Sequence, residues 1–303
     1  MLIKTQFSIK DLENLSGVKA HTIRIWEKRY NLLEPARTDT NIRKYDLINL
    51  KKLLNVTLLY NEGYKISKIA GFKQDEIAKL INSLSKKNQE DFAQQAFKTA
   101  MFDFDHSLFT QTYTKLAKTK SFREIFYQVF LPLLNEIGIL WQTGTIDPSH
   151  ERFISELIKQ KIIINITKLQ EENKDKKVPY FALFLPYEEI HEIGLLFANY
   201  EIVAAGFASV YLGTNIPVDG LKHILKHYEE ITFLSYFTVK PDKESVYDYV
   251  ARFQKTLGAD KPMPLWIMGY KTMGVVHSKL PENVKIVENL EELRLRLQKL
   301  NAT

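Results

Sequence analysis

Residues 7–30 read FSIKDLENLSGVKAHTIRIWEKRY, and this stretch decides the fold of the N-terminal region. Ser8, with Asp11 three residues later, is typical of a helix N-terminus, because the hydroxyl and the carboxylate accept hydrogen bonds from amides that the first turn leaves unpaired. A glycine-containing turn at 16–18 separates this helix from a second one expected over 19–30. Apolar residues recur at helical spacing and are assigned to the core: Ile9, Leu12, Leu15, Ile23 and Trp26.

The segments that follow extend this unit. Residues 31–44 are polar and suit a loop or a short hairpin, and further helices are expected over 46–60 and 66–71. Two helices joined by a short turn form a unit that can place its second helix in the major groove of DNA.

Positive charge is concentrated in this region. Residues 1–74 hold 14 of the 42 Lys and Arg residues and 7 of the 36 Asp and Glu residues, which gives +7; the remaining 28 and 29 give −1. A cationic patch of this kind attracts polyanions, and its contacts with phosphates make binding salt-dependent. A solvated basic surface without a partner is the alternative.

Composition excludes several classes of protein. The chain has 303 residues, of which 45% are hydrophobic, so it can bury cores in two or three domains. No apolar run approaches the ~18–20 residues that span a bilayer, and the first ten residues do not resemble a signal peptide. The absence of cysteine excludes disulfides and thiolate chemistry. We therefore expect a cytoplasmic protein without a membrane partner.

The middle of the chain has the pattern of a helical bundle. Apolar residues recur at helical spacing throughout residues 73–170, with short polar breaks. Helices are expected near 75–84, 89–100, 106–117, 121–141 and 148–169.

A charged run at 171–177 marks a domain boundary, after which short β-branched or aromatic runs alternate with helical segments. This alternation predicts a doubly wound parallel α/β sheet. Strands are expected at 180–185, 204–212, 231–237, 264–268 and 284–287, and helices at 190–200, 218–228, 245–255 and 290–300. The predicted architecture is multidomain α and α/β: a winged helix-turn-helix (1–74), a central four-helix bundle (75–172) and the doubly wound parallel α/β domain (178–303).

The N-terminal residues closely resemble the MerR family over about 70 residues. The match runs from Phe7-Ser8-Ile9 through Thr22–Tyr30 to Arg43-Lys44-Tyr45. It implies a winged helix-turn-helix that binds double-stranded DNA as a homo-oligomer, a dimer or tetramer. Side chains on the second helix would meet base edges and phosphates, and those of the wing would meet the flanking backbone. The predicted DNA contacts are Lys19, His21, Thr22, Arg24, Lys28, Arg29, Arg37, Arg43, Lys44 and Tyr45.

Each predicted contact has a structural alternative. Any single cation could be an ordinary exposed charge, and Arg29 could pair with Glu27 or Glu34. Trp26 is expected in the core and not against a base.

The C-terminal region resembles the cobalamin-binding fold, which carries a Glu-x-His-x-x-Gly loop. Here the loop is formed by Glu189, His191 and Gly194. The resemblance implies that His191 is the lower axial ligand of cobalt, that Glu189 orients its imidazole and that Gly194 lets the backbone approach the nucleotide tail. Ser235 matches a serine near the dimethylbenzimidazole. The loop motif is weak alone, but it follows a strand, where α/β sheets bind ligands.

The order of the three domains resembles the CarH/LitR group of cobalamin-dependent, light-responsive repressors. In that group the bundle caps the cofactor with a Trp and, ten residues later, Glu-His; here Trp141 and Glu151 match. Three positions depart from the pattern: Arg152 replaces the His, Gln142 replaces a His beside the Trp, and Gly269-Tyr270 replaces a Gly-Gly pair. Cobalamin binding therefore stays open, whereas a light switch through two histidines is not expected.

Three functions compete. The first is a transcriptional regulator, a repressor, whose sensor domain binds cobalamin, so that the ligand changes the oligomer and hence operator affinity. The second is the same regulator with a cofactor-free α/β domain used for oligomerisation or protein binding. The third is a cobalamin-dependent enzyme subunit, but the winged helix takes the place of a catalytic barrel. No P-loop, HExxH or Ser-His-Asp arrangement is present, and His223/His227 lacks a third ligand.

Overall fold

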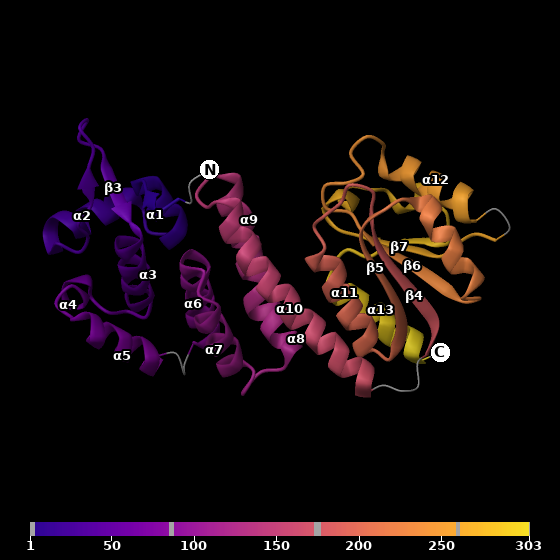
Figure 1. The fold of residues 1–303 in the computed structure, drawn as a ribbon, viewed down its shortest axis with the longest axis horizontal. Coiled ribbons are helices and arrows are strands. Elements are labelled where there is room, and N and C mark those ends of the chain that lie inside the picture. The colour runs from indigo at the N-terminus through magenta and orange to yellow at the C-terminus, as the bar shows by residue number, and fades with distance from the viewer. Residues whose placement is uncertain (1–3, 85–87, 173–176, 259–260, 303) are drawn as a thin grey trace. The chain divides into compact units, whose positions relative to one another are not determined.

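The computed structural model describes residues 4–84, 88–172, 177–258 and 261–302 (Figure 1). The chain forms two compact units, Met1–Ile158 and Lys159–Thr303, and the division falls inside the long helix α10 (Pro148–Glu172). The three domain boundaries expected from the sequence stay a prediction. Within the described ranges, no helix is both long and apolar enough to cross a bilayer.

The first unit begins with the predicted helix-turn-helix and wing. Its elements are β1 (Gln6–Phe7), α1 (Ile9–Ser16), α2 (Ala20–Tyr30), β2 (Ala36–Arg37), β3 (Arg43–Asp46), α3 (Leu47–Asn61) and α4 (Ile66–Ile69). Ser8 and Asp11 form a reciprocal capping box at α1, and Asp46 caps α3, as their positions in the sequence predict. Gly17 ends α1 at φ 72°, a left-handed conformation that favours glycine. β1 and β2 pair antiparallel with β3, which makes the 31–44 segment a hairpin.

The rest of this unit is helical. It contains α5 (Gln74–Leu84), α6 (Gln89–Asp103), α7 (His106–Leu116), α8 (Phe122–Ile125), the π-helix Phe126–Phe130, α9 (Leu131–Gln142) and the start of α10. Phe97, Phe109 and Phe130 are fully buried and in ring contact with one another. Each ring buries a large apolar area, which stabilises the packing of these helices.

The single helix expected over 121–141 is interrupted by the π-helical turn. Pro132 has no amide hydrogen and its ring crowds the carbonyl four residues earlier, which is that of Gln128. The chain widens there into the i→i−5 pattern, with the Leu131 amide bonded to the Phe126 carbonyl. The Gln94 side-chain amide donates to the Gln128 carbonyl at 3.3 Å and replaces the missing partner.

The second unit contains the predicted parallel sheet, in the order β5-β4-β6-β7-β8. The strands are β4 (Lys177–Pro186), β5 (Phe207–Ile216), β6 (Ile231–Tyr236), β7 (Leu265–Met268) and β8 (Val284–Ile286). All their pairings are parallel. The connections reverse direction between β4 and β6, so a topological switch point lies at the carboxyl ends of these two strands.

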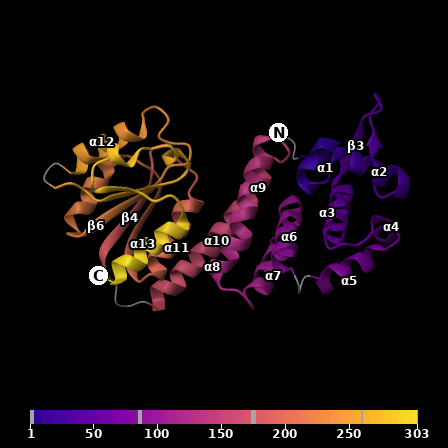
Figure 2. The same ribbon diagram turned by 180° about the vertical axis from the view of Figure 1, so that it is seen from behind.

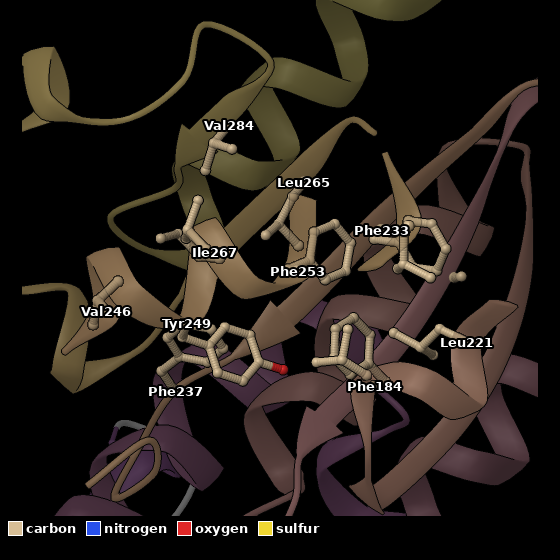
Figure 3. Close-up of a cluster of buried hydrophobic side chains, with 14 of the residues drawn as sticks. Phe184, Leu221, Phe233, Phe237, Val246, Tyr249, Phe253, Leu265, Ile267 and Val284 are labelled. Carbon is tan, nitrogen blue, oxygen red and sulfur yellow. The ribbon is translucent and has the colours of Figure 1, made fainter. Parts of the chain in front are cut away.

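Helices cover both faces of this sheet (Figures 1 and 2). α11 (Ile193–Ala204) and α13 (Leu290–Ala302) contact each other on one face, and α12 (Val246–Leu257) lies on the other. The helix predicted over 218–228 is a 3-10 helix, Val218–Lys226, which contacts α12. Figure 3 shows the apolar layer between the sheet and α12, in which the rings of Phe184, Phe233 and Phe253 contact one another.

Candidate DNA-binding surface and cofactor site

Helix α2 presents a cationic face to solvent. Ile23 and Trp26 are buried, and the Trp26 ring packs edge-on against Tyr60, with 5.1 Å between ring centroids. Trp26 is therefore a core residue, as predicted. The exposed positions of the predicted set on or beside this helix are Lys19, His21, Arg24, Lys28 and Arg29. Thr22 is half-buried, with its hydroxyl 3.3 Å from the His21 Nε2.

Some of these cations have partners within the protein. Lys19 pairs with Glu13 at 3.4 Å, and the Arg29 guanidinium lies 5.6 Å from the centre of the Tyr30 ring. Among the residues that the structure describes, Arg24 and Lys28 have no carboxylate within ion-pairing distance. Arg29, which is exposed, likewise has no carboxylate partner among these residues, so all three side chains are available to an external anion.

Glu27 joins the helix to the wing. Its carboxylate accepts a hydrogen bond from Arg43 Nε and another from the Tyr45 hydroxyl, each at 2.8 Å. The hydrogen bond to Glu27 raises the pKa of Arg43, and burial followed by the same carboxylate raises the pKa of Tyr45. Glu27 therefore pairs with Arg43, not with Arg29 as the alternative for Arg29 supposed.

The predicted wing contacts occupy different environments. Tyr45 is fully buried, so its ring fixes β3 against α2 and does not face solvent, which corrects its assignment as a surface contact. Arg43 is half-buried beside it. Arg37 is exposed near the hairpin tip, where its Nη1 donates to the Asn41 side-chain oxygen at 2.6 Å. Lys44 is partly exposed on the same hairpin.

Replacing Arg43 by alanine is expected to weaken binding to every duplex sequence, because the change removes a cation near the wing and frees Glu27 from its ion pair. The slope of log affinity against log salt should become shallower by about 1. Fluorescence anisotropy titrations over a range of salt concentrations measure that slope, with Arg294→Ala in α13 as a matched control. An unchanged slope would mean that Arg43 does not contact phosphate and acts only in its ion pair with Glu27.

His191 lies in the loop after β4, at the switch point of the sheet. Its Nδ1 is 2.6 Å from Glu189 Oε1, and its side chain is 54% exposed. With Nδ1 engaged by a carboxylate, Nε2 is the ring nitrogen that could ligate a metal.

Glu189 ties this loop to the loop after β6. Its second oxygen accepts hydrogen bonds from the backbone amides of Val239 at 2.7 Å and Lys240 at 2.8 Å. The first oxygen also accepts from the amides of Ile190 and His191. Burial would raise the pKa of Glu189, but the hydrogen bonds from His191 and these amides outweigh it and lower the pKa to about 2. The carboxylate is thus a fixed negative charge that orients the imidazole.

Other residues around the loop were not found by sequence reasoning. Glu192 accepts a hydrogen bond from the Tyr211 hydroxyl at 3.2 Å and pairs with Lys159 at 2.6 Å. Lys159 lies on α10, 33 positions before Glu192, so no local motif connects them. In the sequence, only the position of Glu192 directly after His191 indicates that Glu192 belongs to the site; nothing there indicates Lys159.

The remaining predicted cofactor contacts in this unit have partners within the chain. Ser235 is buried and its hydroxyl donates to the Phe184 carbonyl at 2.9 Å. A Cβ on Gly269 would lie 2.5 Å from the Phe237 carbonyl oxygen, so glycine is required there by the neighbouring backbone. The following Tyr270 side chain is 73% exposed.

In the first unit, Trp141 and Glu151 lie on either side of the α9–α10 turn. Trp141 is 53% exposed, and Glu151 accepts a hydrogen bond from Ser155 at 2.9 Å. Arg152, which stands where the family has a histidine, pairs with Glu156 at 3.7 Å. Trp141 is therefore not a residue of the bundle core.

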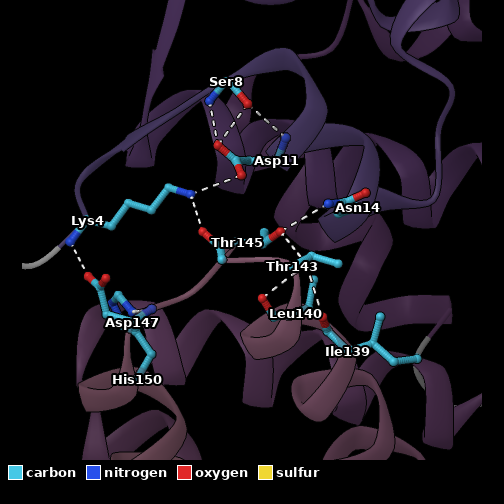
Figure 4. A network of polar contacts seen from close by, with 11 residues as sticks. Lys4, Ser8, Asp11, Asn14, Ile139, Leu140, Thr143, Thr145, Asp147 and His150 are labelled. Carbon is cyan, nitrogen blue, oxygen red and sulfur yellow. Dashed lines mark hydrogen bonds and ion pairs between the residues drawn. The ribbon is translucent and has the colours of Figure 1, made fainter.

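The α9–α10 turn also contacts the winged helix (Figure 4). Lys4 Nζ donates to the Gly144 carbonyl at 2.8 Å and pairs with Asp11, while the Lys4 amide donates to Asp147. Asn14 on α1 donates to the Thr145 hydroxyl at 3.0 Å. Phe7 packs edge-on against Phe102, and Lys51 pairs with Asp103. The winged helix and the bundle therefore share one packed unit.

Comparison with known families identifies two segments of the chain. Residues 7–76 match the MerR HTH family regulatory protein, and residues 93–164 match the B12 binding domain.

Two curated relatives span most of this chain. The HTH-type transcriptional repressor CarH of Myxococcus xanthus is 24% identical, over 87% of this chain and 88% of its own length. The HTH-type transcriptional repressor CarA of the same organism is 22% identical, over 94% of each. The chain is homologous to both, and the resemblance expected from the sequence is confirmed.

A solved structure shares the fold. The monomethylamine corrinoid protein of Methanosarcina barkeri superposes with a TM-score of 0.54 at 15% identity, covering 67% of this chain and 96% of that one. The fold class predicted from the sequence, multidomain α and α/β, is confirmed.

Proposed function

We propose that this chain is a DNA-binding transcriptional regulator, acting as a repressor, whose sensor region binds a cobalamin. One observation carries the proposal: a MerR-type domain with an exposed cationic helix precedes a B12-binding domain in the same chain. Both curated relatives are named transcriptional repressors, and the chain is a regulator and not an enzyme.

Helix α2 is the element that we expect to enter the major groove. Arg24 can donate two hydrogen bonds to a guanine edge, whereas Lys28 is suited to phosphate. Arg37 and Lys44 on the hairpin would contact the flanking backbone. A homo-oligomer, dimer or tetramer, would hold two such helices at a fixed spacing and so bind two half-sites far better than one.

The His191 loop has the donor that would hold the cobalt of a corrinoid. The carboxylate of Glu189 holds Nδ1, so the imidazole is fixed in orientation and presents Nε2 to a ligand. Cobalamin, when bound, supplies a cobalt ion that accepts such a nitrogen. Trp141 and Glu151 stay predicted contacts, and the cytoplasmic location stays a prediction. Because Gln142 and Arg152 replace histidines, we do not expect a light response through two histidine ligands.

The test is a DNA-binding assay on the upstream region of the protein's own gene, with and without adenosylcobalamin, in the dark and in light. We expect affinity to change with the cofactor and to be insensitive to light. If the protein binds no DNA duplex even at low ionic strength, the proposal that it is a DNA-binding regulator is wrong. Duplex binding that is the same with and without the cofactor would favour a second function, described next.

That second function is the same regulator with a cofactor-free α/β domain used for oligomerisation or protein binding. It is favoured by the internal partners that Ser235 and Gly269 already have. Purification in the presence of hydroxocobalamin separates the two functions. A red protein with one corrinoid per chain supports a sensor, and a colourless protein of unchanged oligomeric state supports the cofactor-free domain.

A further inference from the structure

The Tyr236 ring occupies the space beside Gly194. A Cβ built on Gly194 would lie 2.7 Å from Tyr236 Cζ and 2.9 Å from Cε2, closer than real side chains approach one another. Gly194 is the second residue of α11, so its backbone is helical and does not itself require glycine. The ring of Tyr236 is therefore what excludes a side chain at this position.

The strand geometry explains why the ring points there. Successive side chains of a strand point to opposite faces of a sheet. The Ser235 hydroxyl donates to the Phe184 carbonyl of the neighbouring strand β4. The next residue of β6, Tyr236, points to the opposite face, which α11 covers. Burial raises the pKa of Tyr236, in keeping with a ring that is mostly withdrawn from water.

This packing limits which corrinoid can reach His191. Cobalamin carries a nucleotide whose base binds the lower face of its own cobalt, and a protein imidazole must displace that base. The displaced nucleotide then needs room near the histidine loop. Gly194, Ser235 and Gly269 are the residues that the sequence assigned to it, and each already packs against this chain.

We propose that the sensor binds a corrinoid without the nucleotide tail, of the cobinamide class, more tightly than it binds a cobalamin, and that Tyr236 sets this preference. The inference rests on the proposed function, because it concerns the ligand of the same site. His191 Nε2 would hold the cobalt of such a corrinoid in place of a bound water, and this exchange would leave the oxidation state of the metal unchanged.

The experiment titrates the full-length protein with diaquocobinamide and, separately, with hydroxocobalamin. Visible absorption reports histidine ligation, and calorimetry gives the affinity. The wild type should bind cobinamide at least about tenfold more tightly, a difference of about 1.4 kcal/mol. Tyr236→Ala should remove most of that difference by improving cobalamin binding. Tyr236→Phe keeps the ring and should behave as the wild type does.

A second measurement tests the packing independently of any ligand. Gly194→Ala should lower the melting temperature of the wild type and have little effect in the Tyr236→Ala background, since the clash then has no partner. Equal effects in the two backgrounds would contradict the packing, and with it the specificity proposed for Tyr236.

The outcomes separate the two proposals. Equal affinity of the wild type for both corrinoids, with histidine ligation in each, overturns the specificity and leaves the proposed function intact. Binding of neither corrinoid by the wild type or by Tyr236→Ala overturns the cofactor itself. Loss of the ligation spectrum in His191→Ala, with retained melting temperature, assigns the signal to His191.

Discussion

Glu189→Ala is expected to destabilise the C-terminal unit by about 3–5 kcal/mol, the usual cost of breaking a buried charged hydrogen-bond network from one side. The Glu189 carboxylate is almost fully buried and accepts hydrogen bonds from four backbone amides and from His191. Its removal leaves these donors without an acceptor and separates the loop after β4 from the loop after β6. Chemical denaturation followed by circular dichroism measures the loss.

A matched control for this prediction is Glu188→Ala. Glu188 is the neighbouring acid, exposed to solvent, and it pairs with Lys240 and Lys243. Exposed pairs of this kind contribute little to stability, because water and salt screen them, so this variant should unfold nearly as the wild type does. If the two variants lost the same stability, Glu189 would not connect the two loops in the way that its hydrogen bonds indicate.

Arg24→Ala is expected to weaken specific DNA binding by about 10- to 100-fold, in the range of 1–3 kcal/mol that one bidentate base contact contributes to discrimination. Arg24 is exposed on α2 and is not paired with a carboxylate among the described residues. Its removal therefore breaks no internal ion pair, and the melting temperature should be retained. Anisotropy titration with the operator and with scrambled duplexes measures affinity and specificity together.

The control for Arg24 is Lys118→Ala, which removes an exposed cation that follows α7 in the bundle. The same loss of charge there should leave DNA affinity within about twofold, since it lies outside the cationic helix. Weakening of operator and scrambled duplexes by the same factor would make Arg24 a phosphate contact and not a base contact.

Much of the fold follows from local patterns. Ser8 and Asp46 mark helix starts because their side chains accept from helical amides, and both act as caps in the structure. The strand–helix alternation after residue 177 predicts the parallel sheet correctly. Helical periodicity, however, does not distinguish an α-helix from the π-turn before Pro132 or from the 3-10 helix Val218–Lys226. Those departures depend on a missing amide and on tertiary contacts.

The candidate sites show the same limit. The sequence places His191 beside Glu189, and the structure brings the two together at 2.6 Å, because they are two residues apart in one loop. It does not anticipate that Tyr45 is buried on Glu27, which is 18 residues away, or that Tyr236 packs on Gly194, 42 residues away. Contacts at such separations depend on strand register and helix docking, which no local motif encodes.

The turn between α9 and α10 carries a practical consequence for anyone who dissects this protein. Phe7 is fully buried and contacts Phe102. Lys4 and Asn14 form hydrogen bonds with Gly144 and Thr145 of the turn. A fragment that ends after residue 74 would expose Phe7 to water and leave Lys4 and Asn14 without their hydrogen-bond partners in the turn. The winged helix is thus not expected to fold stably alone. Fusions or truncations intended to keep DNA binding should retain the chain through the first turns of α10.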